Sequence, residues 1–190
     1  MQKKEIVTIC GGLGSGKSST AKLVAKELGF EHFSAGDFTR KIALKMGISV
    51  TELAKLEETD KSIDNKVDEE LKKTGEVEKR VIDTRLGFHF IPKSFKVYLD
   101  LLPEIAKERI MNNLTENSLR KESEHAESAE EVYQNIIARL QSEKKRYKEY
   151  YGIEDYTDRK NFDLVVDTNK NNLEEVVDII VAEYKKWMEN

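Results

Sequence analysis

The residues that point most directly to chemistry lie near the start of the chain, in the segment GGLGSGKS at residues 11–18. This segment matches the pattern G-x-x-x-x-G-K-[ST], in which backbone amides converge on phosphate oxygens with no Cβ in the way. A helix that begins at such a loop adds the positive end of its dipole to the anion site. The segment therefore predicts a nucleotide phosphate-binding loop. Its predicted nucleotide contacts are Gly11, Gly12, Leu13, Gly14, Ser15, Gly16, Lys17, Ser18 and Ser19.

Three side chains at the end of this loop have distinct predicted roles. Lys17 reaches the β- and γ-phosphates, Ser18 supplies a hydroxyl ligand to Mg²⁺, and Ser19 donates to the α-phosphate. The alternative is a glycine-rich turn that only joins a strand to a helix. The lysine, the serine and both flanking segments fit the motif, which favours the phosphate site.

Loops of this kind occur in GTPases, ATPases and small-molecule kinases, and two other segments argue against a GTPase. A guanine site needs Asn-Lys-x-Asp after a late strand, whereas residues 169–172 read NKNN. The spacing from Asp83 to Gly87 is one residue too long for the D-x-x-G segment of a GTPase. A nucleotide switch therefore remains a minor alternative to a kinase.

A phosphoryl transferase must hold a second anion in line with the γ-phosphate, and candidate cations follow two predicted strands. Arg40 lies one helical turn beyond the segment SAGD at residues 34–37, and Arg85 lies two residues after Asp83. Ligands of open parallel sheets bind outside the carboxyl ends of the strands, so we predict that both arginines face the phosphate-binding cleft. The alternative for each arginine is a solvated surface charge.

Two carboxylates accompany these arginines. Asp83 ends an apolar strand, where P-loop proteins place the carboxylate that organises Mg²⁺, although an aspartate here could also begin a turn. Asp37 either accepts a hydroxyl of the acceptor or caps the next helix, and both roles can hold together.

A third group of charges lies in the second half of the chain. Arg139, Glu143 and Arg146 have the spacing i, i+4, i+7, which places them on one face of a helix. Residues 112–129, just before this helix, are charged and lack apolar periodicity. A charged strip followed by an arginine-bearing helix predicts a lid that closes over a polyphosphate. The alternative is a solvated, charged helix face.

The elements that must position these residues can be predicted from hydrophobic patterning. Short, β-rich apolar segments alternate with segments of helical periodicity, which predicts an α/β fold with a parallel sheet of about five strands and helices on both faces. We expect one domain over residues 1–190, with an acceptor-binding helical insertion near residues 36–74 and a lid near residues 112–150. The predicted strands are residues 3–10, 31–34, 80–83, 95–100 and 162–167.

Composition excludes several classes of protein. With 190 residues and one cysteine, the chain can bury a full hydrophobic core without disulfides. No apolar run approaches the ~18 residues that span a bilayer, so we expect no membrane association. The formal net charge of −4 argues against general nucleic-acid binding. We therefore expect a cytoplasmic protein, and a monomer.

Taken together, these motifs resemble the nucleoside monophosphate kinases, most of all the short, archaeal-type cytidylate kinases. The resemblance extends over nearly the whole chain and includes the segments SAGD with Arg40, AKERI at residues 106–110 and RYKEYYG at residues 146–152. It implies a P-loop fold and ATP-dependent, Mg²⁺-dependent phosphorylation of CMP or dCMP. It further implies that Lys17, Arg139 and Arg146 bear on the transferring phosphoryl group. Arg109 would stack on the adenine, and Ser34, Asp37, Arg40 and Arg85 would hold the acceptor.

The chain departs from the family pattern in places that bear on the acceptor base. The family motif resembles I-D-R-x-I-D-x-x-Q, whereas this chain has Asn65 and Glu70 in place of the arginine and the glutamine. Asn113 stands where related adenylate kinases have a second arginine. Two alternatives therefore stay open. One is a P-loop kinase for another small acceptor, such as dephospho-coenzyme A, a shikimate-like alcohol or another nucleotide, and the other is a non-enzymatic, nucleotide-gated interaction module.

Overall fold

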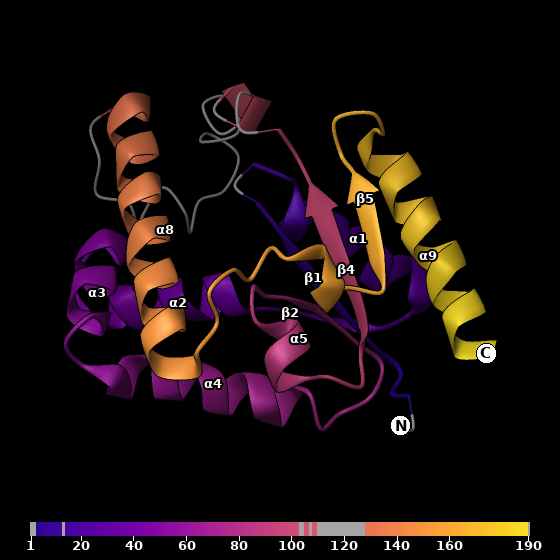
Figure 1. The fold of residues 1–190 in the computed structure, drawn as a ribbon, viewed down its shortest axis with the longest axis horizontal. Helices are drawn as coiled ribbons and strands as arrows, with labels where there is room; N and C mark the ends of the chain where they lie inside the picture. Colours follow the sequence, from indigo (N-terminus) through magenta and orange to yellow (C-terminus); the bar gives the residue numbers. More distant parts are fainter. Residues whose placement is uncertain (1–2, 13, 103–104, 107, 110–127, 190) are drawn as a thin grey trace. The chain divides into compact units, whose positions relative to one another are not determined.

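The structure is a computed structural model that describes residues 3–12, 14–102, 105–106, 108–109 and 128–189 (Figure 1). The chain divides into two compact units, which we describe one at a time. The core unit consists of Met1–Ala35, Asp68–Ala106 and Tyr156–Asn190, and the helical unit consists of Gly36–Val67 and Lys107–Asp155.

The core unit contains a five-stranded sheet with the order β2-β3-β1-β4-β5, in which every neighbouring pair is parallel (Figure 1). The fold and the strands predicted from the sequence are confirmed. Each strand is short and rich in β-branched or aromatic residues, as expected for a sheet that is buried on both faces. The strands are β1 (Ile6–Gly11), β2 (Glu31–Ser34), β3 (Arg80–Asp83), β4 (Phe95–Asp100) and β5 (Leu164–Asp167).

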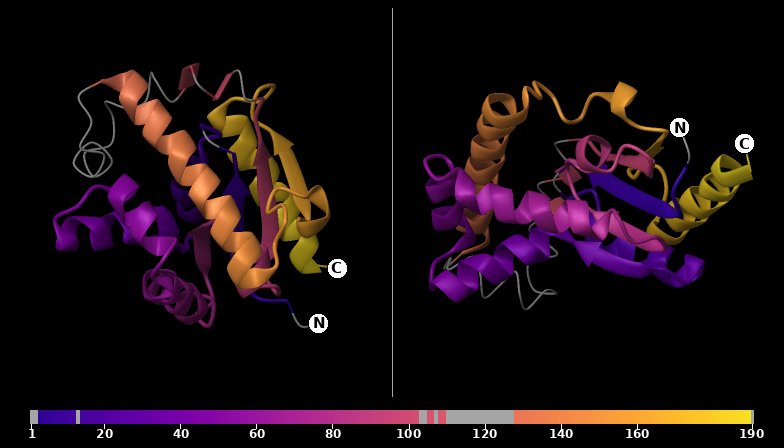
Figure 2. Two further views of the ribbon diagram at one scale, coloured as in Figure 1. Left: turned by 60° about the vertical axis from the view of Figure 1, so that its left-hand side comes forward. Right: turned by 90° about the horizontal axis from the view of Figure 1, so that it is seen from below.

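Helices cover both faces of this sheet. Val7 and Ile9 of β1 point to one face, where they pack with α1 (Lys17–Leu28) and α9 (Leu173–Glu189) in one buried apolar cluster. Thr8 points to the other face and lies against the short helix α5 (Gly87–Phe90). Figure 2 shows α1 and α9 in two further views of this layered arrangement.

The strand register brings polar residues together at the carboxyl edge of the sheet. Asp83, the last residue of β3, is the register partner of Ile9 in β1 and of Ser34 in β2. The chain leaves β1 two residues later, at Gly11. The ends of β2 and β3 therefore lie beside the start of the glycine-rich loop, which places Ser34 and Asp83 next to it.

The helical unit has its own small apolar core. Ala43, Val50, Leu53 and Ile63 are buried together there. The helix α3 (Val50–Glu57) begins with a capping box, in which Ser49 N donates to Glu52 Oε2 at 2.7 Å and Glu52 N donates to Ser49 Oγ at 3.1 Å. Its helices are α2 (Ala35–Met46), α3 (Val50–Glu57), the first half of α4 (Lys61–Thr74) and α8 (Ala129–Tyr151).

The structure differs from the predicted elements in a few places. The second half of the helical insertion predicted near residues 36–74 is two helices, because the chain turns at residues 58–60 and Asp60 then accepts a hydrogen bond from Ser62 N at 2.9 Å. The helix α5 and the 3₁₀ turn Arg159–Asn161 were not predicted. Residues 110–127, most of the first half of the predicted lid, lie outside the described residues. The assignment of residues 1–190 to a single domain stays a prediction.

Candidate phosphoryl-transfer site

The glycine-rich loop connects β1 directly to α1, as its motif predicts. Gly14 has a left-handed backbone with φ of 68°, and a Cβ there would lie 2.9 Å from the Ala106 carbonyl oxygen. A Cβ on Gly11 would lie 2.6 Å from Ser15 Oγ and 2.7 Å from the Leu99 carbonyl oxygen. Both positions therefore require glycine. Leu13, also assigned to this loop from the sequence, lies outside the described residues.

Two side chains hold the loop from within. Ser15 is 2% exposed, and its Oγ donates to the Gly12 carbonyl oxygen at 2.9 Å. Lys17 Nζ donates to the carbonyl oxygens of Gly11 and Gly12, both at 3.0 Å. The ammonium group therefore lies across the loop, where backbone amides and the N-terminus of α1 favour an anion. Ser19 is exposed in the first turn of α1.

Asp83 forms the second half of this site in the core unit. Its side chain is buried at the end of β3, where Oδ2 accepts hydrogen bonds from Ser18 Oγ at 2.6 Å and from Ser34 Oγ at 3.3 Å. The structure thus brings together Ser18 and Asp83, the two predicted metal ligands, and Ser34, a predicted acceptor-binding residue. Their direct hydrogen bonds fix the direction of the carboxylate.

The donor atoms around Asp83 fit a magnesium ion. Mg²⁺ prefers oxygen ligands, and it is usually bound by one or two protein groups with phosphates and waters completing the shell. The Ser18 hydroxyl and the Asp83 carboxylate offer two such oxygens beside the loop. Among the described residues, no group of three or more acidic, histidine or cysteine side chains forms a complete metal cage. These two oxygens would supply only part of a magnesium coordination shell.

Three charged side chains act on Cys10 near the end of β1. Burial raises the pKa of the Cys10 thiol to about 11, while the positive charges of Lys17 and Arg85 act in the opposite direction. Asp83 acts on the same thiol and raises its pKa. Arg85, which is partly exposed two residues after β3, therefore lies near the same strand end as Lys17.

Four more predicted site residues, two for the acceptor and two for ATP and the transferring phosphoryl group, belong to the helical unit. Asp37 and Arg40 form an ion pair within α2, with Arg40 Nη1 3.1 Å from Asp37 Oδ1. Arg109 and Arg139 are both partly exposed. The ion pair with Asp37 restricts the orientation of the Arg40 guanidinium on the first turns of α2.

Arg146 is the one predicted site residue whose surroundings differ clearly from expectation. The spacing on α8 suggested a guanidinium whose charge only a polyphosphate could fully use. Instead Arg146 is 3% exposed, its Nη2 lies 2.7 Å from Glu57 Oε2, and its Nη1 lies 2.5 Å from both carboxylate oxygens of Asp64. Its charge is thus already paired within the helical unit. A direct contact of Arg146 with the transferring phosphoryl group stays a prediction.

The two carboxylates that bind Arg146 were missed by sequence reasoning. One signal for Glu57 was present, because Val50, Leu53, Ala54 and Glu57 share one helical face and are all buried. A glutamate on an apolar face calls for a buried partner. No comparable signal existed for Asp64, which lies 82 residues from Arg146 in the chain.

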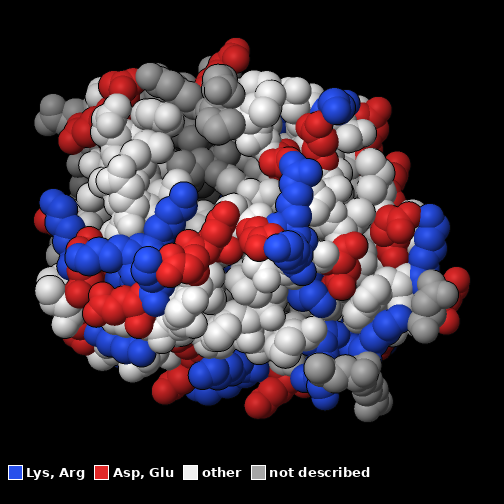
Figure 3. All heavy atoms as spheres, viewed as in Figure 1, with Lys and Arg blue, Asp and Glu red and all other residues white. Residues whose placement is uncertain are grey.

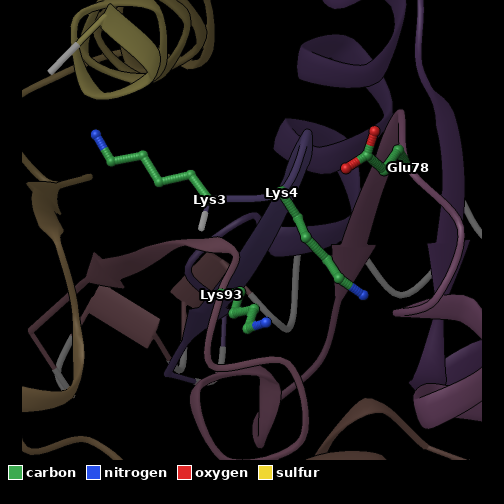
Figure 4. A pocket seen from close by; sticks show the side chains of 4 residues that line it. All are labelled: Lys3, Lys4, Glu78 and Lys93. Carbon is green, nitrogen blue, oxygen red and sulfur yellow. The ribbon is translucent and has the colours of Figure 1, made fainter. Parts of the chain in front are cut away.

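A small hollow elsewhere in the core unit is unsuited to be the phosphate site. It has a volume of about 130 Å³ and is lined by Lys3, Lys4, Glu78 and Lys93, which precede strands β1, β3 and β4 (Figure 4). It therefore lies at the amino edge of the sheet, opposite the glycine-rich loop. Lys3 Nζ donates to the Trp187 carbonyl oxygen and Lys4 Nζ to that of Gly75, so both lysines already have acceptors.

Comparison with known proteins places the chain in a family. Residues 7–131, more than half of the chain, match the family described as AAA domain. The cytidylate kinase of Methanocella arvoryzae is 36% identical over 185 residues, which cover 95% of this chain and 99% of that protein. The cytidylate kinase of Archaeoglobus fulgidus is 33% identical over 184 residues, with 95% and 96% covered. The chain belongs to the family of archaeal-type cytidylate kinases.

Membership of this family confirms the resemblance found in the sequence, and it makes the chain a P-loop kinase. A further relative, the S-adenosylmethionine-dependent nucleotide dehydratase of Lacinutrix mariniflava, is 35% identical over 185 residues, but the chain spans only 36% of its length. Among solved structures, shikimate kinase from Bacteroides thetaiotaomicron has a TM-score of 0.62 at 15% identity, with 95% of this chain and 98% of that chain covered. The similarity to shikimate kinase, at this low sequence identity, shows a shared fold only.

The face of the molecule drawn in Figure 3 carries charged side chains of both signs. Lysine and arginine side chains alternate with aspartate and glutamate over the face drawn in Figure 3, without a large area of one sign. Among the described residues, no helix is both long and apolar enough to cross a membrane.

Proposed function

We propose that this kinase transfers the γ-phosphoryl group of ATP to CMP or dCMP, giving the nucleoside diphosphate and ADP. The observation that carries the proposal is the Ser18–Asp83 pair beside the glycine-rich loop and Lys17. Together these groups supply the phosphate cradle, the cation and the metal ligands that phosphoryl transfer from a nucleoside triphosphate needs. The similarity to cytidylate kinases over nearly the full length of the chain supports the choice of acceptor.

The proposed mechanism is direct, in-line transfer without a covalent enzyme intermediate. The loop amides bind the phosphates of ATP, and the Lys17 ammonium stabilises charge on the β- and γ-oxygens as the bond to the leaving group breaks. Ser18 and Asp83 would hold Mg²⁺, which supplies charge neutralisation and orientation of the phosphates when bound. Ser34 fixes the Asp83 carboxylate through its hydrogen bond.

Other proposed roles follow from the family. Arg40 and Arg85 hold the phosphate of the acceptor, and Asp37 accepts a hydroxyl of its sugar. Arg109 stacks on the adenine of ATP, and Arg139 contacts the transferring phosphoryl group. The reaction then needs positioning and charge neutralisation only, which these side chains provide. We propose a cytoplasmic, monomeric enzyme.

A nucleotide acceptor is favoured over an alcohol such as shikimate. The likeness to shikimate kinase is 15% in sequence, whereas the cytidylate kinases are 33–36% identical. The dehydratase relative is likewise named for action on a nucleotide.

Release of ADP in the presence of different acceptors tests the proposal. The acceptors are CMP, dCMP, UMP, AMP, dephospho-coenzyme A and shikimate, with a blank that lacks an acceptor. We expect CMP or dCMP to give the highest kcat/KM. Turnover that is at least tenfold better with AMP or with a non-nucleotide would contradict the proposed acceptor, and ADP release that no acceptor stimulates would contradict the kinase reaction.

A further inference from the structure

A buried charge cluster joins three helices of the helical unit. Arg146 of α8 contacts Glu57 at the end of α3 and Asp64 in the first turn of α4, and the three side chains are 4%, 6% and 10% exposed respectively. Arg146 Nη1 lies 2.5 Å from both carboxylate oxygens of Asp64, and Nη2 lies 2.7 Å from Glu57 Oε2, so the two terminal nitrogens face different carboxylates and the orientation of the guanidinium is restricted. We call these three residues the Arg146 cluster.

The cluster is the centre of a polar contact between α8 and α3. Ser142 Oγ donates to the Ala54 carbonyl oxygen at 3.1 Å, and Tyr150 Oη donates to the Glu57 carbonyl oxygen at 3.0 Å. Ser142, Arg146 and Tyr150 recur at intervals of four residues and so share one face of α8. Hydrogen bonds at three successive turns fix both the rotation and the axial position of one helix on the other.

The same face of α8 carries the proposed phosphoryl-contacting residue. Arg139 and Glu143 precede Arg146 by seven and three residues, and the charges of both act on the pKa of Glu57. They therefore lie close to the Arg146 cluster. Any rotation of α8 that breaks the cluster also displaces Arg139.

We propose that Arg146, Glu57 and Asp64 are positioning residues, which clamp α8 to α3 and α4 and thereby set the orientation of Arg139. The inference rests on the proposed function, because it assigns Arg139 to the reaction. It differs from the prediction that Arg146 itself contacts the transferring phosphoryl group. Moving the Arg146 guanidinium to a phosphate would leave the Asp64 carboxylate buried without a partner, which is strongly unfavourable.

A double-mutant cycle separates the two roles. The variants are Arg146→Met, Asp64→Asn and the double variant, and the matched control is Lys145→Met. Lys145 directly precedes Arg146 on α8, and its Nζ forms an exposed ion pair with Glu58 Oε2 at 2.9 Å. For each variant we would measure kcat, the KM values for ATP and CMP, and amide hydrogen exchange in residues 133–151, at a temperature where all variants are folded.

The clamp predicts strong coupling in this cycle. Arg146→Met and Asp64→Asn should each lower kcat about tenfold, because displacement of a contacting group by a fraction of an ångström has effects of this order. The double variant should be no slower than the slower single variant, and hydrogen exchange in α8 should rise equally in all three. Lys145→Met should match the wild-type protein in both readouts. In the double variant Glu57 still loses its ion-pair partner, whereas Asp64→Asn keeps Arg146 paired with Glu57, so Asp64→Asn tests the clamp even where the variants that lack Arg146 fail to fold.

Four results would overturn the clamp. Two of them would show that Arg146 acts on the phosphoryl group directly. In the first, Asp64→Asn keeps the wild-type kcat while Arg146→Met lowers kcat strongly. In the second, Arg146→Met lowers kcat by the same factor in the Asp64→Asn protein as in the wild-type protein. Lower thermal stability with unchanged kcat in all variants would show a purely structural cluster. If the wild-type protein phosphorylates no nucleoside monophosphate, the proposed function fails, and unchanged exchange in α8 of Arg146→Met and Asp64→Asn would then refute the clamp by itself.

Discussion

Replacing Gly14 with alanine tests whether the glycine-rich loop must keep the backbone path seen here. Gly14 and Gly29, which ends α1, share a φ of 68°, but they differ in their surroundings. A Cβ on Gly14 would lie 2.9 Å from the Ala106 carbonyl oxygen, whereas a Cβ on Gly29 would meet nothing within 4 Å. Gly29→Ala is therefore a matched control that has the same backbone strain without the clash.

The expected sizes of the two effects follow from these surroundings. The left-handed conformation costs an alanine roughly 1–2 kcal/mol at either position. Gly14→Ala adds about 1–3 kcal/mol of overpacking against the Ala106 backbone. For a chain of this length each kcal/mol lowers Tm by about 2–4 °C. Gly29→Ala should thus lower Tm by roughly 2–8 °C, and Gly14→Ala should lower it further.

Activity should separate the two variants more sharply than stability does. Gly29→Ala leaves the loop untouched, so its KM for ATP should equal that of the wild-type protein. In Gly14→Ala the loop must shift to relieve the clash, and a loss of only ~1.4 kcal/mol in nucleotide binding raises the KM for ATP about tenfold. Thermal unfolding and initial-rate kinetics on both variants measure this. Equal Tm values and equal KM values in the two variants would refute the reasoning.

Three further outcomes are expected. Lys17→Ala should lower kcat by about a hundredfold or more, equivalent to ~2.7 kcal/mol of lost transition-state stabilisation. Lys22→Ala, on the exposed side of α1, is the control and should keep the wild-type kcat. Initial-rate kinetics measure both variants, and a wild-type rate in folded Lys17→Ala would rule out the role of this lysine. Asp83→Asn should raise the Mg²⁺ concentration needed for half-maximal rate, and an unchanged Mg²⁺ titration would remove Asp83 from the metal site. Burial raises the pKa of Glu57 from 4.5 to about 8, so the folded chain holds a proton that the unfolded chain has released between these values. Stability should therefore fall as the pH rises through this range, and Glu57→Gln should flatten the fall in urea-unfolding free energy; an unchanged slope would contradict this assignment.

Much of the core unit could be predicted from the sequence, because its strands and its phosphate-binding loop are each specified by short, contiguous segments. The five strands are short apolar segments bounded by turn residues, and the phosphate-binding loop is a contiguous motif whose glycines have specific backbone requirements. Parallel strands end at one edge of the sheet, which explains why the ends of β2 and β3 bring Ser34 and Asp83 together. The helix α5 was missed because four residues are too few to show helical periodicity.

The helical unit was harder to predict, because its decisive contacts join residues far apart in the chain. The i, i+4, i+7 spacing correctly placed Arg139, Glu143 and Arg146 on one helix face. Spacing within a helix says nothing about what that face packs against, and Arg146 finds its partners on α3 and α4. Glu57 on the buried face of α3 was the only local sign that a basic partner was needed.

The identity of the products tests the central claim most directly. The wild-type protein is incubated with Mg²⁺, ATP and CMP, and the nucleotides are separated by anion-exchange chromatography over the time course of the reaction. Direct transfer to CMP predicts that ADP and CDP appear in equal amounts, with no release of inorganic phosphate. ADP that accumulates with inorganic phosphate and without CDP would contradict the account, because the site would then pass the phosphoryl group to water.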